Sequence, residues 1–147
     1  MTGGDVLQKY LEKVADRLAR AGTGASVSVG FLAGSVNRSG ESIPVYMAAN
    51  EFGTSRIPPR PFFRNMIAAK GPAWGGNVAE LLKNTEYDSA LTLIRMGHLI
   101  SGQLQVSINE TNTPPNAPST IARKGASKPL IDTSDAWKSV NFVVTGP

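Results

Sequence analysis

The chain has 147 residues, no cysteine, a single histidine and a formal net charge of +4. A hydrophobic fraction of 41% fits one domain with its own core and argues against overall disorder. The missing cysteines exclude disulfides and thiol nucleophiles, and the charge excess is too small to require a nucleic-acid partner. No apolar run is long enough to span a bilayer, and the first residues lack a signal-peptide pattern. We therefore expect a protein made in the cytoplasm.

The N-terminal third predicts a helix, a strand and a hairpin. Apolar side chains recur at helical spacing over residues 5–21, with charged residues filling the other face. Residues 25–33 alternate between apolar and small polar side chains, as a half-buried strand does. The polar stretch 34–43 has no core residues and predicts a hairpin tip.

The middle of the chain predicts short helices separated by prolines. Pro44 favours a helix start, so a helix is predicted over residues 45–52 and should end at Gly53. Prolines then hold the chain extended up to Pro61. A second helix is predicted from residue 61 or 62 to residue 69, ended by Lys70-Gly71-Pro72. Residues 77–83 could add another turn or two.

The longest predicted helix covers residues 87–109, and apolar residues on two of its faces suggest a central position. A polar, proline-rich and basic loop follows over residues 111–130. Residues 132–138 predict a short capped helix and residues 140–145 a last strand. One face of the long helix carries Leu93, Met96, Ile100, Leu104 and Ile108, and the second carries Tyr87, Leu91 and Ile94.

This order of elements predicts an α+β fold in a single domain, residues 1–147. A small antiparallel sheet should pack against the long central helix and the N-terminal helix. The stretches 34–43 and 111–130 should project from the domain as long loops.

Catalytic chemistry is not indicated. His98 is the only histidine, so it cannot form a multi-histidine metal site, and a packed or boundary position explains it best. The acidic residues Asp132 and Asp135 are explained by helix capping. No glycine-rich phosphate loop is present. We therefore expect a protein that is not an enzyme and that holds no cofactor or metal.

The stretch from Arg56 to Lys70 is basic and contains two phenylalanines. It could be a solvated helix face above two core phenylalanines. It could equally pair with acidic residues of a neighbouring subunit or contact DNA phosphates. The sequence leaves all three interpretations open.

Three segments resemble small morphogenesis proteins of tailed phages. Residues 48–54 (AANEFGT) followed by residues 57–64 (IPPRPFFR) are similar to the N-E-F-G-T … I-P-x-R-P-F-x-R segment of minor tail, tail-completion and head-tail joining proteins. Residues 117–125 (APSTIARKG) and 128–133 (KPLIDT) resemble two further segments of Mu-like virion morphogenesis proteins, in the same order. Ser134 and Trp137 depart from that pattern.

The resemblance implies a structural virion protein of the neck or upper tail, assembled in the host cytoplasm as a ring around the DNA channel. Six-fold rings, contacts to neighbouring connector and tail proteins, and non-specific contact with packaged DNA would follow, without a membrane partner. A DNA-binding accessory protein or assembly factor is the alternative. The residues expected at subunit interfaces or the DNA channel are Glu51, Phe52, Arg56, Arg60, Phe62, Arg64, Arg123, Lys124, Asp132 and Trp137.

Overall fold

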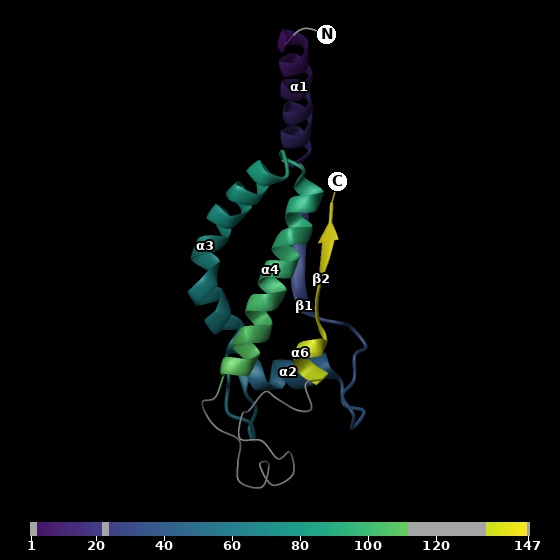
Figure 1. The fold of residues 1–147 in the computed structure, drawn as a ribbon. Coiled ribbons are helices and arrows are strands. Elements are labelled where there is room, and N and C mark those ends of the chain that lie inside the picture. Colours follow the sequence, from purple (N-terminus) through teal and green to yellow (C-terminus); the bar gives the residue numbers. More distant parts are fainter. Residues whose placement is uncertain (1–2, 22–23, 112–134, 147) are drawn as a thin grey trace. The chain divides into compact units, whose positions relative to one another are not determined.

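The computed structural model describes residues 3–21, 24–111 and 135–146. The predicted loop 111–130, except for its first residue, therefore lies outside the described residues, as do Arg123, Lys124 and Asp132. The chain is mostly helical with a two-stranded antiparallel sheet, so the predicted α+β class is confirmed. The elements, drawn in Figure 1, are α1 (Gly3–Ala21), β1 (Ser26–Phe31), α2 (Ile43–Phe52), α3 (Phe62–Asn84), α4 (Ser89–Glu110), α6 (Asp135–Lys138) and β2 (Val140–Thr145).

Contacts divide the chain into two compact units. The α1 unit contains Met1–Ser28, Ala73–Leu99 and Phe142–Pro147, and the α2 unit contains Val29–Pro72 and Ile100–Asn141. Helices α3 and α4 each contribute residues to both units, and so do both strands. The boundary between the units thus falls within regular elements and not in a linker.

The α2 unit contains most of the buried core. Helix α2 buries Ile43 and Met47, and α3 buries Phe62 and Met66. The predicted inner face of α4 is confirmed in both units. Leu104 and Ile108 are buried and Ile100 is half-buried in the α2 unit, and Met96 is buried and Leu93 half-buried in the α1 unit.

The second apolar face of α4 does not form a core face. Leu91 is 37% exposed and Ile94 is 40% exposed. The second apolar face of α4 is therefore only partly covered, whereas its first face is buried.

Helix α3 is longer than the sequence predicted. The expected stop at Lys70-Gly71-Pro72 was wrong, since the helix continues through Pro72 to Asn84 and includes the stretch 77–83. A proline within a helix loses one backbone hydrogen bond and strains the preceding turn. The apolar residues beyond it offset that cost, because Trp74, Val78 and Leu81 are half-buried.

The hairpin tip closes on itself as predicted. Val36 and Ser42 form an antiparallel bridge, and the Asn37 side chain accepts hydrogen bonds from the backbone N–H groups of Ser39 (2.9 Å) and Glu41 (3.0 Å). An asparagine in this role shapes a turn locally, without help from a hydrophobic core.

The α1 unit has fewer buried side chains. Its α3–α4 turn is held by a hydrogen bond of 2.8 Å between the hydroxyls of Thr85 and Thr92. In α4, the ring of Phe142 lies against Gly97, and His98 stacks edge-on against the same ring with centroids 4.8 Å apart. His98 is exposed, which agrees with a boundary position. None of the described helices is both long and apolar enough to cross a membrane.

Candidate functional site

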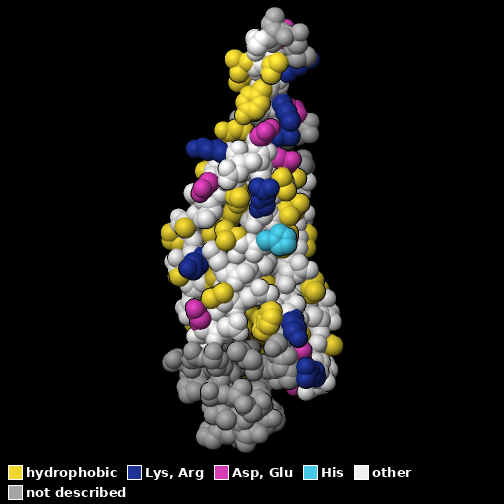
Figure 2. Space-filling view, in the orientation of Figure 1, with side chains coloured by type: hydrophobic (Ala, Val, Ile, Leu, Met, Phe, Trp, Pro, Cys, Tyr) yellow, Lys and Arg dark blue, Asp and Glu magenta, His cyan; other side chains and the backbone are white. Residues whose placement is uncertain are grey.

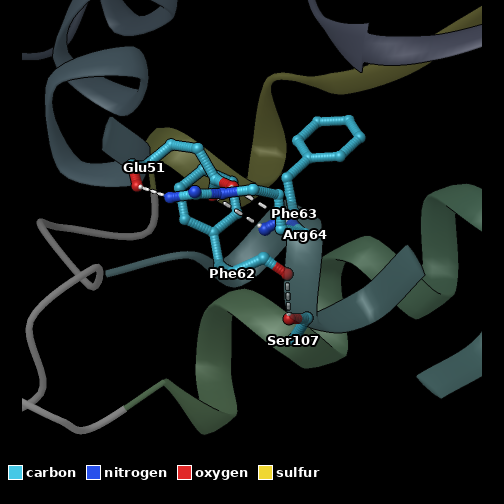
Figure 3. A network of polar contacts seen from close by, with 5 residues as sticks. All are labelled: Glu51, Phe62, Phe63, Arg64 and Ser107. Carbon is cyan, nitrogen blue, oxygen red and sulfur yellow. Dashed lines mark hydrogen bonds and ion pairs between the residues drawn. The ribbon is translucent and has the colours of Figure 1, made fainter. Parts of the chain in front are cut away.

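The segment that carries the first sequence motif, residues 48–64, forms one connected structure between α2 and α3. We call it the motif corner. Its polar groups join the end of α2 to the start of α3, as Figure 3 shows for Glu51, Arg64 and their neighbours. Each motif residue can therefore be assigned a position and a set of contacts.

Glu51 caps helix α3 from the neighbouring helix. Its carboxylate accepts hydrogen bonds from the backbone N–H groups of Phe63 (2.9 Å) and Arg64 (3.1 Å). Glu51 is only 5% exposed. The first N–H groups of a helix lack partners within the helix, and a negative charge there also favours the helix dipole. Glu51 therefore stabilises the start of α3 although it lies outside that helix.

The side chain of Arg64, in α3, contacts Glu51 of α2. Its Nε atom lies 2.9 Å from the Glu51 carboxylate, and its terminal nitrogen donates to the Glu51 backbone carbonyl at 2.7 Å. The guanidinium also lies 5.2 Å from the ring centroid of Phe52, within cation–π range. The Arg64 side chain is 56% exposed, so one side of it reaches solvent.

Arg60 lies inside the corner. It is 6% exposed, and its guanidinium donates to the side-chain oxygen of Asn50 at 3.1 Å. The Asn50 amide donates in turn to the Tyr46 carbonyl at 2.9 Å. Burial lowers the pKa of Arg60 below its usual value, although Tyr46 opposes the shift. An arginine keeps its charge in spite of such a shift, so this cation stabilises the bend through hydrogen bonds.

The bend itself requires glycine at position 53. Gly53 has φ of 78°, and a Cβ atom there would lie 3.0 Å from the ring of Pro59. The hydroxyl of Thr54 accepts from the backbone N–H groups of Arg56 (3.2 Å) and Ile57 (3.0 Å). The sequence Gly-Thr followed by prolines is thus explained by one tight turn.

Phe62 fixes the corner to the core. It is 1% exposed and packs edge-on against Phe31 with ring centroids 6.1 Å apart. Its carbonyl accepts a hydrogen bond of 2.6 Å from the hydroxyl of Ser107 in α4, which Figure 3 also shows. The start of α3 is thereby bound to both α2 and α4.

Three of the expected interface residues lie inside the fold. Glu51, Arg60 and Phe62 are buried inside the α2 unit, so a partner cannot reach their side chains in this structure. They were expected at a subunit interface because charged and aromatic residues there resembled a contact surface. The structure shows that their polar groups bind within the chain.

Other expected interface residues do reach the surface. Phe52 is 70% exposed, Arg56 is exposed and Arg64 is half-exposed. Trp137 is half-buried, and its carbonyl accepts a hydrogen bond of 3.1 Å from the Gln105 side chain.

Apart from Phe52, the residues of two apolar stripes with exposed side chains were not among the expected site residues. The α2 stripe consists of Val45, Ala48, Ala49 and Phe52, on the side of α2 opposite its buried residues, and Val45 is 69% exposed. The α1 stripe consists of Val6, Leu7, Tyr10 and Leu11, which are 55%, 57%, 45% and 52% exposed. Figure 2 shows hydrophobic side chains gathered on α1. The helical spacing signalled both stripes, but apolar periodicity normally indicates a core face.

The described residues offer little for catalysis. They contain no group of three acidic, histidine or cysteine side chains that could hold a metal ion. A groove beside Met66 of α3 and Val106 of α4 has a volume of about 460 Å³, with Lys70 and Glu110 as its charged lining residues. That lining has no histidine or paired carboxylates to serve as acid and base. Comparisons with protein-family models, curated proteins and solved structures give no match for this chain.

Proposed function

We propose that this chain is a structural virion protein of a tailed bacteriophage, acting in the head-tail joining region or upper tail. It assembles in the host cytoplasm as a ring around the DNA channel, in contact with itself and with neighbouring connector and tail proteins. It works by binding other subunits and not by catalysis.

The resemblance of three ordered segments to phage morphogenesis proteins carries this proposal. The motif corner supports it physically, because residues that are separate in the motif cooperate in one structure. Glu51 binds Arg64, Asn50 binds Arg60, and Gly53 accommodates Pro59. A short sequence motif can match by chance, whereas contacts among the motif residues explain physically why each residue is present.

The exposed stripes agree with an assembling protein. Soluble monomers rarely leave apolar helix faces uncovered, and such faces usually contact another chain. The α2 stripe overlaps the motif corner on its outer side, since Ala48, Ala49 and Phe52 belong to both. The corner would therefore serve as the rigid support, and the stripe beside it as a contact surface.

The experiment is to purify particles of the phage that encodes the chain, count its copies by mass spectrometry and locate it by cryo-electron microscopy. The proposal predicts ring density at the neck or the top of the tail, and unjoined heads and tails when the gene is deleted. Absence from the particle would contradict it. Absence together with salt-sensitive DNA binding by the purified protein would instead support a DNA-binding accessory protein.

A further inference from the structure

The first half of α1 has exposed apolar side chains, whereas residues of its second half contact the turn between α3 and α4. Arg17 donates to the backbone carbonyls of Thr85 (3.3 Å) and Glu86 (2.7 Å) in the same unit, and Lys13 lies 3.9 Å from the Glu86 carboxylate. The α1 stripe lies N-terminal to these contacts and has no described cover. The exposed apolar side chains of this helix can therefore contact a partner.

The α2 stripe offers a matching surface. Along this face of α2, the large side chains of Val45 and Phe52 lie one turn before and one turn after the small side chains of Ala48 and Ala49. The only charged residue of α2 is Glu51, and it is buried on the opposite side. An apolar helix could therefore dock without desolvating a charge of α2.

The spacing of the two stripes suits helix-on-helix packing. Leu7 and Leu11 form a ridge of residues four apart, and so do Val6 and Tyr10. Ridges of this kind pack into the grooves between similar rows on a facing helix. The ridge Leu7–Leu11 can lie over the small side chains of Ala48 and Ala49, with Tyr10 and Phe52 as the large aromatic contacts.

The ring of the proposed function favours pairing the unlike stripes. The α1 stripe exposes roughly 400 Å² of apolar surface and the α2 stripe somewhat less, within the range of the largest patch on a soluble monomer. Pairing α1 with α1 and α2 with α2 would cover both stripes, but each contact would then be two-fold symmetric. A cyclic ring requires an unlike contact, such as α1 of one copy on α2 of the next.

We propose that the α1 stripe of one copy docks head-to-tail on the α2 stripe of the next copy. A head-to-tail contact of this type closes a ring when the rotation between copies allows it. The inference deepens the ring assembly of the proposed function and takes its closed symmetry from it, although the contact itself can be tested on purified protein. One contact buries less than a standard protein interface, so free copies should associate weakly and a closed ring more strongly.

The test is light scattering on two full-length variants, Leu7→Glu and Phe52→Glu, measured singly and mixed. Wild-type mass should rise with concentration, and each variant alone should stay monomeric, with association weakened tenfold or more. An equimolar mixture of the two variants should form dimers and no larger oligomers. In that mixture, the intact α1 of Phe52→Glu can dock on the intact α2 of Leu7→Glu, whereas the remaining stripes are both blocked.

Three results would overturn the inference. Wild-type protein that stays monomeric at concentrations on the order of 1 mM would show that no such contact exists. Self-association of Phe52→Glu at wild-type strength would show that α1 pairs with α1. A mixture that stays monomeric would rule out the unlike pairing. Urea unfolding of both variants checks that they fold, and Leu7→Ser and Phe52→Ser replace any that does not.

Failure of this contact is distinguishable from failure of the proposed function. The solution experiment concerns only how copies touch, while the particle experiment asks whether the chain is in the virion. A chain found at the neck with no α1–α2 docking would keep the function and discard the contact.

Discussion

Large side chains are buried at the motif corner, whereas comparable side chains on α1 are exposed to water. Phe62 of the corner is 1% exposed, but Leu7 of α1 is 57% exposed. The corner also keeps the charged residues Glu51 and Arg60 inside, with hydrogen bonds to satisfy them. On α1, Lys9, Glu12, Lys13 and Asp16 are exposed, as is the apolar stripe.

This difference separates two tasks within one chain. The residues that look most distinctive in the sequence stabilise the fold, while plain aliphatic residues at the surface remain available for binding. A buried contact contributes to the free energy of unfolding, and an exposed one contributes only when a partner arrives. Substitutions in the two regions should therefore affect different measurements.

The largest effect on stability is expected at Phe62. Phe62→Ala should lower the free energy of unfolding by about 3–5 kcal/mol, because it removes a buried ring and leaves a cavity. The matched control Phe52→Ala, at a site 70% exposed, should change it by less than about 0.5 kcal/mol. Urea denaturation followed by circular dichroism measures both. Equal losses from the two variants would remove the distinction between corner and stripe.

The cap on α3 should give the next largest effect. Glu51→Ala should cost about 2–3 kcal/mol, because two N–H groups of α3 and the Arg64 guanidinium lose their acceptor. Glu12 of α1 provides the control, since it is exposed and pairs with Gln8 at 3.0 Å. Glu12→Ala should change stability by less than about 0.5 kcal/mol. A cost at Glu51 no larger than that at Glu12 would show that the cap is not a significant stabiliser.

Two glycines of α4 differ in the space that a side chain would have. A Cβ atom at Gly97 would lie 2.3 Å from the Phe142 ring, whereas one at Gly102 meets nothing within 4 Å. Gly97→Ala should therefore destabilise by about 1–3 kcal/mol through overpacking. Gly102→Ala should stabilise by about 0.5–1 kcal/mol, because alanine favours helix. Thermal unfolding of the two variants should shift in opposite directions, and shifts of the same sign would contradict the packing described for Phe142.

The smallest effect on stability is expected in the α1 stripe. Leu11→Ser should change the free energy of unfolding by less than about 0.5 kcal/mol, since Leu11 is 52% exposed. The same substitution should weaken self-association, which sedimentation velocity over a concentration series measures. A large loss of stability with unchanged association would mean that α1 packs on its own chain.

Much of the fold was predictable because its signals are local. The helix over residues 5–21, the strand over residues 140–145 and the helix after Pro44 followed from periodicity and caps. The continuation of α3 through Pro72 was not, since it depends on the packing of Trp74 and its neighbours. Tertiary contacts overrode a local stop signal there.

The roles of the motif residues within the chain were not predictable from the sequence. The sequence predicted contacts to a partner or to DNA for the motif segment, whereas the structure shows polar contacts within the chain there. Sequence could not show that Glu51 caps a helix twelve residues away, because a carboxylate on a surface and one under a helix look alike in a string of letters. The exposed stripes were missed for a related reason, since an apolar stripe is the same pattern whether it is covered or not.

The buried residues of the motif corner should stabilise the fold, and the exposed stripes should bind other subunits. The most direct measurement is the yield of joined, infectious particles from a phage carrying Phe52→Glu, compared with the urea midpoint of the purified variant protein. We expect the variant protein to keep the wild-type urea midpoint while heads and tails remain separate. Wild-type particle yield from a stably folded Phe52→Glu protein would contradict it.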